Sequence, residues 1–298
     1  MKLLLFLLSP FLFYSQTEGF SENKDHSQTF YRVYGSGFPL LVINGGPGMN
    51  SKGFETLVET LSENRQVILY DQRGTGKSTL EKIDASTISM DLMIDDMESL
   101  RKHLGIQKWN LLGHSFGGML ASYYATKHPE AIEKMILSSS GGIDLGLLSY
   151  VNKRIYSKLN KTERDSLAYW NSKIAGGDTI PRVRLGRGRA LAPAYIFDRK
   201  NIPVLAERLT QGNADINELL WNNMRKIDFD CAPALKNYDK PVLIVQGKQD
   251  IIKIETAEIA HKAFKNSKII LFKNCGHIGW LDAKDDYFFE ISDFLKPS

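Results

Sequence analysis

The stretch from Trp109 to Ala125 reads WNLLGHSFGGMLASYYA: an apolar run, a glycine-rich turn and then a helix-like segment. Its centre, Gly113 to Gly117, has the pattern G-x-S-x-G between a strand and a helix. The two glycines remove Cβ atoms that would collide in so sharp a turn, and the serine adopts a strained backbone conformation. The pattern predicts that Ser115 is an exposed nucleophile at a helix N-terminus; an ordinary glycine-rich turn is the alternative.

Apolar runs alternate with amphipathic segments on both sides of this turn. The runs expected to be strands are residues 39–43, 66–70, 109–112, 134–137, 241–245 and 268–272. They lack polar alternation, which is typical of parallel strands buried on both faces. The order of strands and helices predicts an α/β fold with a mostly parallel sheet and crossover helices.

Residues 141–235 interrupt this alternation, because they contain helix-like stretches and no clear strand. The insertion begins where a strand ends, at the carboxyl edge of the sheet, and ligands bind at that edge in such folds. We therefore expect a core formed by residues 28–140 and 236–298 and a helical cap, or lid, formed by residues 141–235. A structural excursion without a role at the site is the alternative.

The first 16 residues, MKLLLFLLSPFLFYSQ, differ from the rest of the chain. One lysine precedes an apolar run that is shorter than the ~20 residues of a membrane-spanning helix, as in a secretory signal peptide. Residues 1–16 thus predict a secreted or periplasmic protein without stable membrane association after cleavage; an uncleaved anchor is the alternative. Cys231 and Cys275 could pair outside the cytoplasm, but we expect two unpaired thiols.

Composition sets further limits on function. The chain has 298 residues, 43% hydrophobic and 24% charged, with a net charge of +4, as expected for one large globular domain. Its basic residues form no tracts with interleaved aromatics, so nucleic-acid binding is not predicted. The segment Asp71 to Ser78 (DQRGTGKS) lacks the first glycine of a phosphate-binding loop, and we expect a structural turn organised by Asp71 and Arg73. No metal or organic cofactor is predicted.

A serine nucleophile needs a base and an orienting carboxylate, here in the chain order Ser, Asp, His. The strand 241–245 leads into Asp250, and the strand 268–272 leads into His277. Both residues follow the carboxyl end of a strand, where side chains from separate strands converge. Ser115, Asp250 and His277 are therefore the predicted catalytic residues, although Asp250 could also be a helix cap.

The attacked carbonyl oxygen becomes negative and needs backbone N–H groups directed at it. One donor is expected from Phe116, the residue after the nucleophile. The other is expected from residues 44–48 (NGGPG), where glycines let the backbone approach closely and proline donates no competing N–H. Gly46 is the predicted second donor; a tight turn without this role is the alternative.

Five motifs together resemble the α/β-hydrolase serine peptidases of the proline iminopeptidase type, and the resemblance covers most of the chain after about residue 28. The motifs are NGGPG at 44–48, DQRGTGKS at 71–78, GHSFGG at 113–118, QGKQD at 246–250 and CGHIGW at 275–280. The resemblance implies an α/β-hydrolase fold and carries an oxyanion-hole role onto Gly46. The chain departs from the family at Asn44, where the family usually has histidine, so the hydrogen bonds that fix this loop are expected to differ.

The resemblance also implies an aminopeptidase that releases N-terminal residues, with proline preferred. Such an enzyme must bind an α-ammonium group, for which carboxylates near the site are suited. In the family, a cap Asn-Glu pair supplies one; Asn217-Glu218 occupies a comparable place, and Glu207 is a weaker candidate. A plain surface position is the alternative for Glu218.

Two other functions stay open. The cap contains four arginines within eight positions, Arg182, Arg184, Arg187 and Arg189. If they face the cleft, they favour anionic substrates and hence an esterase or another acyl hydrolase. A noncatalytic binding protein of the same fold is a third possibility, but it gives no reason to keep Ser115, Asp250 and His277 together. The expected partner is a small peptide or ester, and the sequence carries no signal for an oligomeric state.

Overall fold

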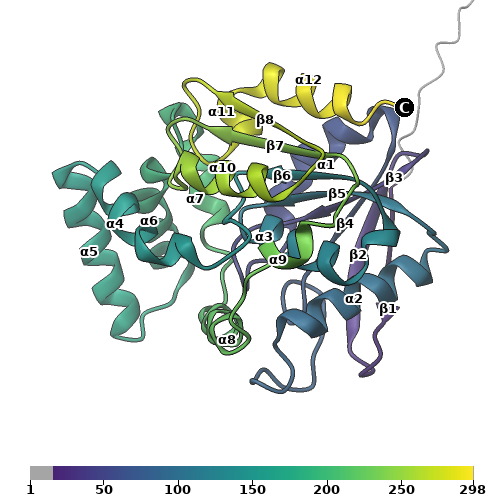
Figure 1. Cartoon of the computed structure of the whole chain (residues 1–298). Coiled ribbons are helices and arrows are strands. Elements are labelled where there is room, and N and C mark those ends of the chain that lie inside the picture. Colours follow the sequence, from purple (N-terminus) through teal and green to yellow (C-terminus); the bar gives the residue numbers. More distant parts are fainter. Residues whose placement is uncertain (1–15, 298) are drawn as a thin grey trace, which may run out of the picture.

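A computed structural model describes residues 16–297, so the predicted leader lies outside the described residues except for Gln16. Eight strands form one sheet in the order β1-β2-β4-β3-β5-β6-β7-β8 (Figure 1). Their bounds are β1 Thr17–Glu22, β2 Gln28–Tyr34, β3 Pro39–Ile43, β4 Gln66–Tyr70, β5 Trp109–His114, β6 Ile132–Ser138, β7 Val242–Gly247 and β8 Ser267–Phe272. The pairs β1·β2 and β2·β4 are antiparallel, and all other pairs are parallel. The predicted mostly parallel α/β sheet is confirmed.

The six predicted strands are β3 to β8, but β1 and β2 were missed. The sheet begins at Thr17 rather than at the expected core boundary, residue 28. β1 (TEGFSE) is a largely exposed edge strand with few apolar residues, so it lacks the continuous apolar run that marked the others. Its pairing with β2, which places Thr17 opposite Val33, is a tertiary contact that composition does not reveal.

Helices cover both faces of the sheet. The core helices are α1 Glu55–Leu61, α2 Met90–His103, α3 Phe116–Lys127, α10 Ile254–Ala263, α11 Gly279–Asp282 and α12 Lys284–Phe294. Leu57 of α1 and Ile291 of α12 belong to one buried cluster, and Met97 of α2, Leu120 of α3 and Ala260 of α10 belong to the other. The sheet is therefore buried on both faces, as the unalternating strands indicated.

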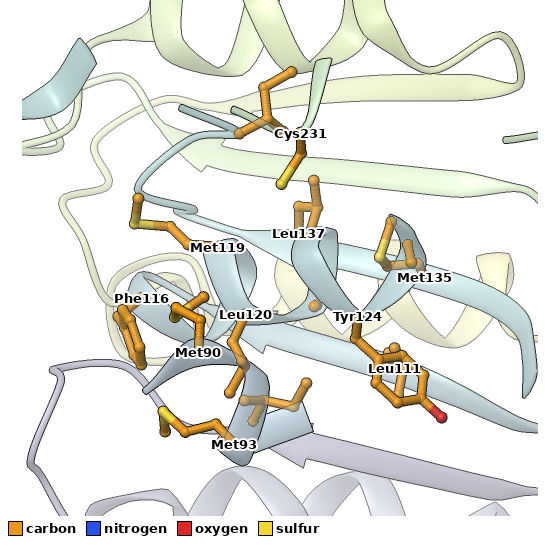
Figure 2. Close-up of a cluster of buried hydrophobic side chains, with 14 of the residues drawn as sticks. Met90, Met93, Leu111, Phe116, Met119, Leu120, Tyr124, Met135, Leu137 and Cys231 are labelled. Carbon is orange, nitrogen blue, oxygen red and sulfur yellow. The ribbon is translucent and has the colours of Figure 1, made fainter. Parts of the chain in front are cut away.

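Figure 2 shows part of the cluster that contains Met97 and Leu120, where side chains of α2, α3 and the central strands pack together. Phe116 and Met119 of α3 lie beside Met90 of α2. Cys231 lies at the edge of the same cluster, and both Cys231 and Cys275 are buried and free, so the prediction of unpaired thiols is confirmed.

Between the end of β6 and the start of β7 the chain forms helices and no strand. These helices are α4 Val151–Lys158, α5 Lys161–Ala175, α6 Pro181–Leu191, α7 Ile202–Arg208, α8 Ala214–Lys226 and α9 Ala232–Leu235. In Figure 1, α4, α5 and α6 lie to one side of the sheet, beyond the core helices. Short 3-10 helices are η1 Lys52–Phe54, η2 Ser62–Asn64, η3 Pro129–Ala131, η4 Gly146–Ser149, η5 Ala192–Ala194 and η6 Arg199–Asn201. We call residues 141–235 the cap below.

No helix within residues 16–297 combines the length and the apolar character needed to cross a lipid bilayer.

Candidate active site

Ser115 lies in the turn between β5 and α3, with φ 56° and ψ −118°. A Cβ on Gly113 would lie 2.3 Å from the carbonyl oxygen of Gly117, and a Cβ on Gly117 would lie 2.1 Å from that of Ile43. Only glycine therefore fits at either end of the turn. The Ser115 N–H donates to the carbonyl oxygen of Ser138 at 3.0 Å, which fixes the turn against β6.

Asp250 and His277 are brought together from the loops that follow β7 and β8. Nδ1 of His277 lies 2.8 Å from Oδ1 of Asp250, and the same oxygen accepts the N–H of Ile252 at 2.9 Å. Asp250 is fully buried and His277 is 4% exposed. The backbone N–H of His277 donates to the carbonyl oxygen of Tyr195 in the cap at 2.6 Å. Asp250 thus holds the imidazole, and the cap holds the backbone of the same residue.

The third predicted catalytic side chain is not hydrogen-bonded to this pair. Among residues 16–297, no hydrogen bond joins Ser115 Oγ to His277, but the ring of His114, adjacent to Ser115, lies 4.8 Å from the ring of His277 between centroids. Catalytic hydrogen bonds are often long or poorly aligned in free enzymes and shorten when substrate binds. The two halves of the predicted site therefore meet at the His114 ring.

His114 forms a neutral wall of the site. It is buried between the rings of Phe54, at 5.6 Å, and Trp280, at 4.8 Å. Burial lowers its pKa well below the usual value, and the nearby charges of His277 and Arg208 lower it further. His114 is not among the predicted catalytic residues, yet its ring lies beside that of His277.

The loop of residues 44–49, called the 44–49 loop below, has every backbone carbonyl in a hydrogen bond. In chain order, the donors are Gln72 Nε2 to Asn44 (2.8 Å), Arg208 Nη2 to Gly45 (2.9 Å), Met49 N to Gly46 (2.9 Å), Asn217 Nδ2 to Pro47 (3.0 Å), Asn213 N to Gly48 (2.8 Å) and Asn44 Nδ2 to Met49 (2.9 Å). Three of these donors belong to the cap. Asn44 closes the loop with its own side chain.

The N–H groups of Gly46 and Phe116, by contrast, have no acceptor among residues 16–297. Gly46 has φ +78°, a conformation that L side chains rarely adopt. A Cβ on Gly45 would lie 2.6 Å from the Cβ of Ser115, so the 44–49 loop packs directly against the serine turn. Two unused backbone donors are therefore available beside Ser115.

The segment 71–78 is a structural turn, as predicted. Oδ1 of Asp71 accepts the N–H of Ser51 at 2.9 Å, just after the 44–49 loop, and Oδ2 accepts the N–H of Lys77 at 2.9 Å. Arg73 is buried and bonded to Asp96 on α2 through two nitrogens. These contacts join the turn to neighbouring loops and confirm the predicted roles of Asp71 and Arg73.

Glu207 on α7 and Glu218 on α8 are both exposed, and neither makes a side-chain hydrogen bond or ion pair within residues 16–297. Their neighbours reach the site instead, because Arg208 bonds Gly45 and Asn217 bonds Pro47. Glu207 lines a pocket of about 180 Å³ together with Arg208 and Trp280. Arg208 is not among the predicted site residues, and its place beside Glu207 is the signal that the sequence offers for it.

Within residues 16–297, no group of three or more His, Cys, Asp and Glu side chains is arranged to hold a metal ion.

A family model described as the α/β hydrolase fold matches residues 39–284. The chain is 28% identical over 282 residues to a proline iminopeptidase of Lactobacillus helveticus, covering 90% of this chain and 94% of that protein. It is 29% identical over 277 residues to a proline iminopeptidase of Saccharolobus solfataricus, covering 89% of this chain and 87% of that protein.

Solved structures show the same fold. A proline iminopeptidase from Mycobacterium smegmatis has a TM-score of 0.73 at 23% identity, covering 94% of this chain and 97% of that one. An esterase from Exiguobacterium antarcticum has a TM-score of 0.73 at 20% identity, covering 94% and 100%. With this family match and these relatives, the chain belongs to the α/β hydrolase fold family, and it is a serine hydrolase.

Proposed function

We propose that the protein is an aminopeptidase that releases N-terminal residues, preferably proline, from peptides through an acyl-enzyme on Ser115. The observation that carries this proposal is the 2.8 Å hydrogen bond between His277 Nδ1 and Asp250 Oδ1 at the edge of the sheet that also presents Ser115. The similarity to proline iminopeptidases supports the peptidase reading.

In the first step, Ser115 Oγ attacks the carbonyl carbon of the first residue, and its proton passes to His277 Nε2. Asp250 keeps Nδ1 protonated and stabilises the imidazolium. The C–N bond then breaks, and the departing amine takes the proton from His277. Burial of the Asp250–His277 pair favours this arrangement, because the hydrogen bond is stronger where water is excluded.

During both steps the negative oxygen is bound by the backbone N–H groups of Gly46 and Phe116, the two donors without acceptors. Water then attacks the acyl-enzyme, with His277 as the base. Its proton returns to Ser115 Oγ as the free N-terminal residue departs.

Recognition of the substrate is assigned to the cap. Trp221 of α8 packs edge-on against Phe116, with ring centroids 6.4 Å apart, and would contribute an apolar surface suited to a proline ring. Glu218 and Glu207 are the proposed partners of the α-ammonium group. The support for this assignment is their position: Arg208, next to Glu207, and Asn217, next to Glu218, both bond the 44–49 loop.

The proposal includes export. It rests on residues 1–16, whose single lysine and short apolar run fit a signal peptide. Fractionation of cells expressing the full chain, followed by N-terminal sequencing, tests it: a mature protein that begins before residue 17 and remains with the cytoplasmic fraction would contradict export.

A second candidate is an esterase or another acyl hydrolase that uses the same residues. The fold similarity to esterases supports it. The four arginines on α6 would favour an anionic substrate if they face the cleft. A noncatalytic binding protein is the least supported reading.

The experiment compares Pro-, Ala- and Leu-β-naphthylamides with short p-nitrophenyl esters. It uses the wild type, Ser115→Ala, Glu218→Gln and Glu207→Gln, with the exposed Glu63→Gln as a matched control. Faster turnover of the Pro amide, its loss in Ser115→Ala and a raised KM in Glu218→Gln or Glu207→Gln with ester turnover retained would support the aminopeptidase. Ester turnover alone would favour the second candidate, and no Ser115-dependent turnover in a folded sample would favour the binding protein.

A further inference from the structure

Arg208, the last residue of α7, is a buried cation without an anionic partner. It is 7% exposed, it forms no ion pair within residues 16–297, and its Nη1 has no hydrogen-bond partner there. The guanidinium lies 4.3 Å from the ring centre of Phe54, and burial lowers the pKa of Arg208 to about 9. A buried charge without a partner is unfavourable for folding. The contacts with the Phe54 ring and with a backbone carbonyl offset this cost only in part, because neither partner carries a charge.

The contact that Arg208 does make is with the 44–49 loop. Its Nη2 donates to the carbonyl oxygen of Gly45 at 2.9 Å. No peptide bond in residues 16–297 is cis, so the planar group joining Gly45 to Gly46 is trans and its C=O and N–H point in opposite directions. Fixing the Gly45 carbonyl toward Arg208 consequently fixes the Gly46 N–H away from it.

We infer that Arg208 is a positioning residue for the oxyanion hole: from the cap, it orients the Gly45–Gly46 peptide so that the Gly46 N–H faces the reacting oxygen. This inference rests on the proposed function. The charge also polarises the peptide that it bonds, which makes the N–H a stronger donor. The 2.6 Å between a Cβ on Gly45 and the Ser115 Cβ places this peptide beside the nucleophile.

The other two bonds from the cap to the 44–49 loop do not orient the Gly46 N–H. Asn217 and Asn213 bond the carbonyls of Pro47 and Gly48. The N–H groups that follow these carbonyls, on Gly48 and Met49, are not the proposed donors. Of the three cap bonds, only that from Arg208 reaches the peptide that carries the Gly46 N–H. From within the loop, the side chain of Asn44 also donates to the Gly45 carbonyl, at the longer distance of 3.4 Å.

The test compares Arg208→Met with Arg164→Met. Arg164 is a cap arginine on α5 that also stacks on an aromatic ring, that of Tyr156 at 5.6 Å, and also donates to a backbone carbonyl, that of Leu159. The control thus removes the same chemical group from the same part of the chain, away from the 44–49 loop. Kinetics with the substrate that the wild type turns over fastest, thermal unfolding and inhibition by pyrrolidine-2-boronic acid are measured for each protein.

For Arg208→Met, we expect kcat to fall by about 10- to 100-fold while KM stays within about threefold, since loss of a whole oxyanion donor costs about 100- to 1,000-fold. The inhibition constant of the boronic acid, whose adduct with serine mimics the tetrahedral intermediate, should rise by the same factor as kcat falls. The Tm should stay equal or rise, because a desolvated charge is removed. Arg164→Met should keep the wild-type kcat.

A second variant guards against misfolding of the first. Arg208→Gln keeps a polar group of shorter reach, and guanidinium chloride at low millimolar concentration can occupy the space that it leaves. Recovery of kcat on adding guanidinium to either variant, with no change in Arg164→Met, would support positioning. A folded variant that loses activity and is not rescued, and whose boronic acid affinity is unchanged, would contradict it.

Three further results would overturn the inference. The first is an unchanged kcat in folded Arg208→Met. The second is a raised KM with an unchanged kcat, which would make Arg208 a binding site for an anionic substrate. The third is a loss of kcat in Arg164→Met equal to that in Arg208→Met. If the wild type and Arg208→Met are equally active, this inference alone is contradicted and the proposed function stands. A wild type without Ser115-dependent turnover removes the proposed function as well.

Discussion

The imidazole of His277 and the carboxylate of Asp250 come from residues 27 positions apart, yet their Nδ1 and Oδ1 atoms lie 2.8 Å apart in a buried contact. The shared oxygen also accepts the N–H of Ile252. The backbone of Ile252 thus holds the carboxylate in the orientation in which it meets the imidazole. This geometry determines which nitrogen of His277 carries the proton and which faces outward.

Asp250→Asn tests this relationship directly. The amide preserves the shape of the side chain but can present N–H to His277, which favours the wrong tautomer, and we expect kcat to fall by about 10⁴-fold. Steady-state kinetics with thermal unfolding measures both activity and folding. The exposed Asp165→Asn serves as the control and should match the wild type; a folded Asp250→Asn with near-normal kcat would contradict the role of Asp250.

Gly46→Ala tests the second oxyanion donor against Gly177→Ala. Both glycines have positive φ, +78° and +88°, but a Cβ on Gly46 would lie 2.2 Å from Sδ of Met49, whereas nothing lies within 4 Å of one on Gly177. Backbone strain should lower the unfolding free energy of both variants by about 1 kcal/mol. Only Gly46→Ala should also lose about 100-fold in kcat, because its N–H moves. Equal kcat values in the two variants would exclude Gly46 as a donor.

Glu98 on α2 should contribute to acid sensitivity. Burial alone would raise the pKa of Glu98, but hydrogen bonds from Arg101 and Tyr124 outweigh it and lower the pKa from the usual 4.5 to about 2. Because the pKa is lower in the folded state, the stabilisation is present above pH 4.5 and is lost as the pH falls from 4.5 toward 2.

Unfolding measurements across this pH range test the assignment. Glu98→Gln should be less stable than the wild type at pH 7 by about 1 kcal/mol, after allowance for solvent screening, and should lose less stability between pH 4.5 and 2. The exposed Glu63→Gln should follow the wild-type curve. Parallel curves for Glu98→Gln and the wild type would show that Glu98 does not contribute.

The two thiols should be inert in the native protein. Both are buried; burial raises the pKa of Cys231 to about 12 and likewise raises the pKa of Cys275, so little thiolate forms at neutral pH. Ellman's reagent should detect no thiol before denaturation and two afterwards, without a reductant. Detection of none after denaturation would reveal a disulfide.

The fold could be predicted because its signals are local. A strand buried on both faces must be apolar throughout, and the serine turn requires glycine at 113 and 117, so both features appear in short stretches of sequence. Asp250 and His277 followed from chain order and from their places after β7 and β8. β1 was missed because an exposed edge strand needs no apolar run.

The contacts of the cap could not be predicted, because they depend on how each helix is rotated. Successive helical residues point about 100° apart, so one step along α7 decides between the exposed Glu207 and the buried Arg208. The same step on α8 separates Glu218 from Asn217, which bonds Pro47. The resemblance indicated carboxylates at these places, whereas the tertiary packing directs an arginine and an asparagine toward the 44–49 loop.

The three cap donors to the 44–49 loop have a consequence for the order of events in a turnover. A movement of α7 and α8 wide enough to admit a peptide would break the bonds to Gly45 and Pro47 and release the loop. The protein could then admit substrate only while the 44–49 loop is released, and could carry out the reaction only while the loop is held. An open molecule would therefore leave a bound peptide uncut until α7 and α8 close again.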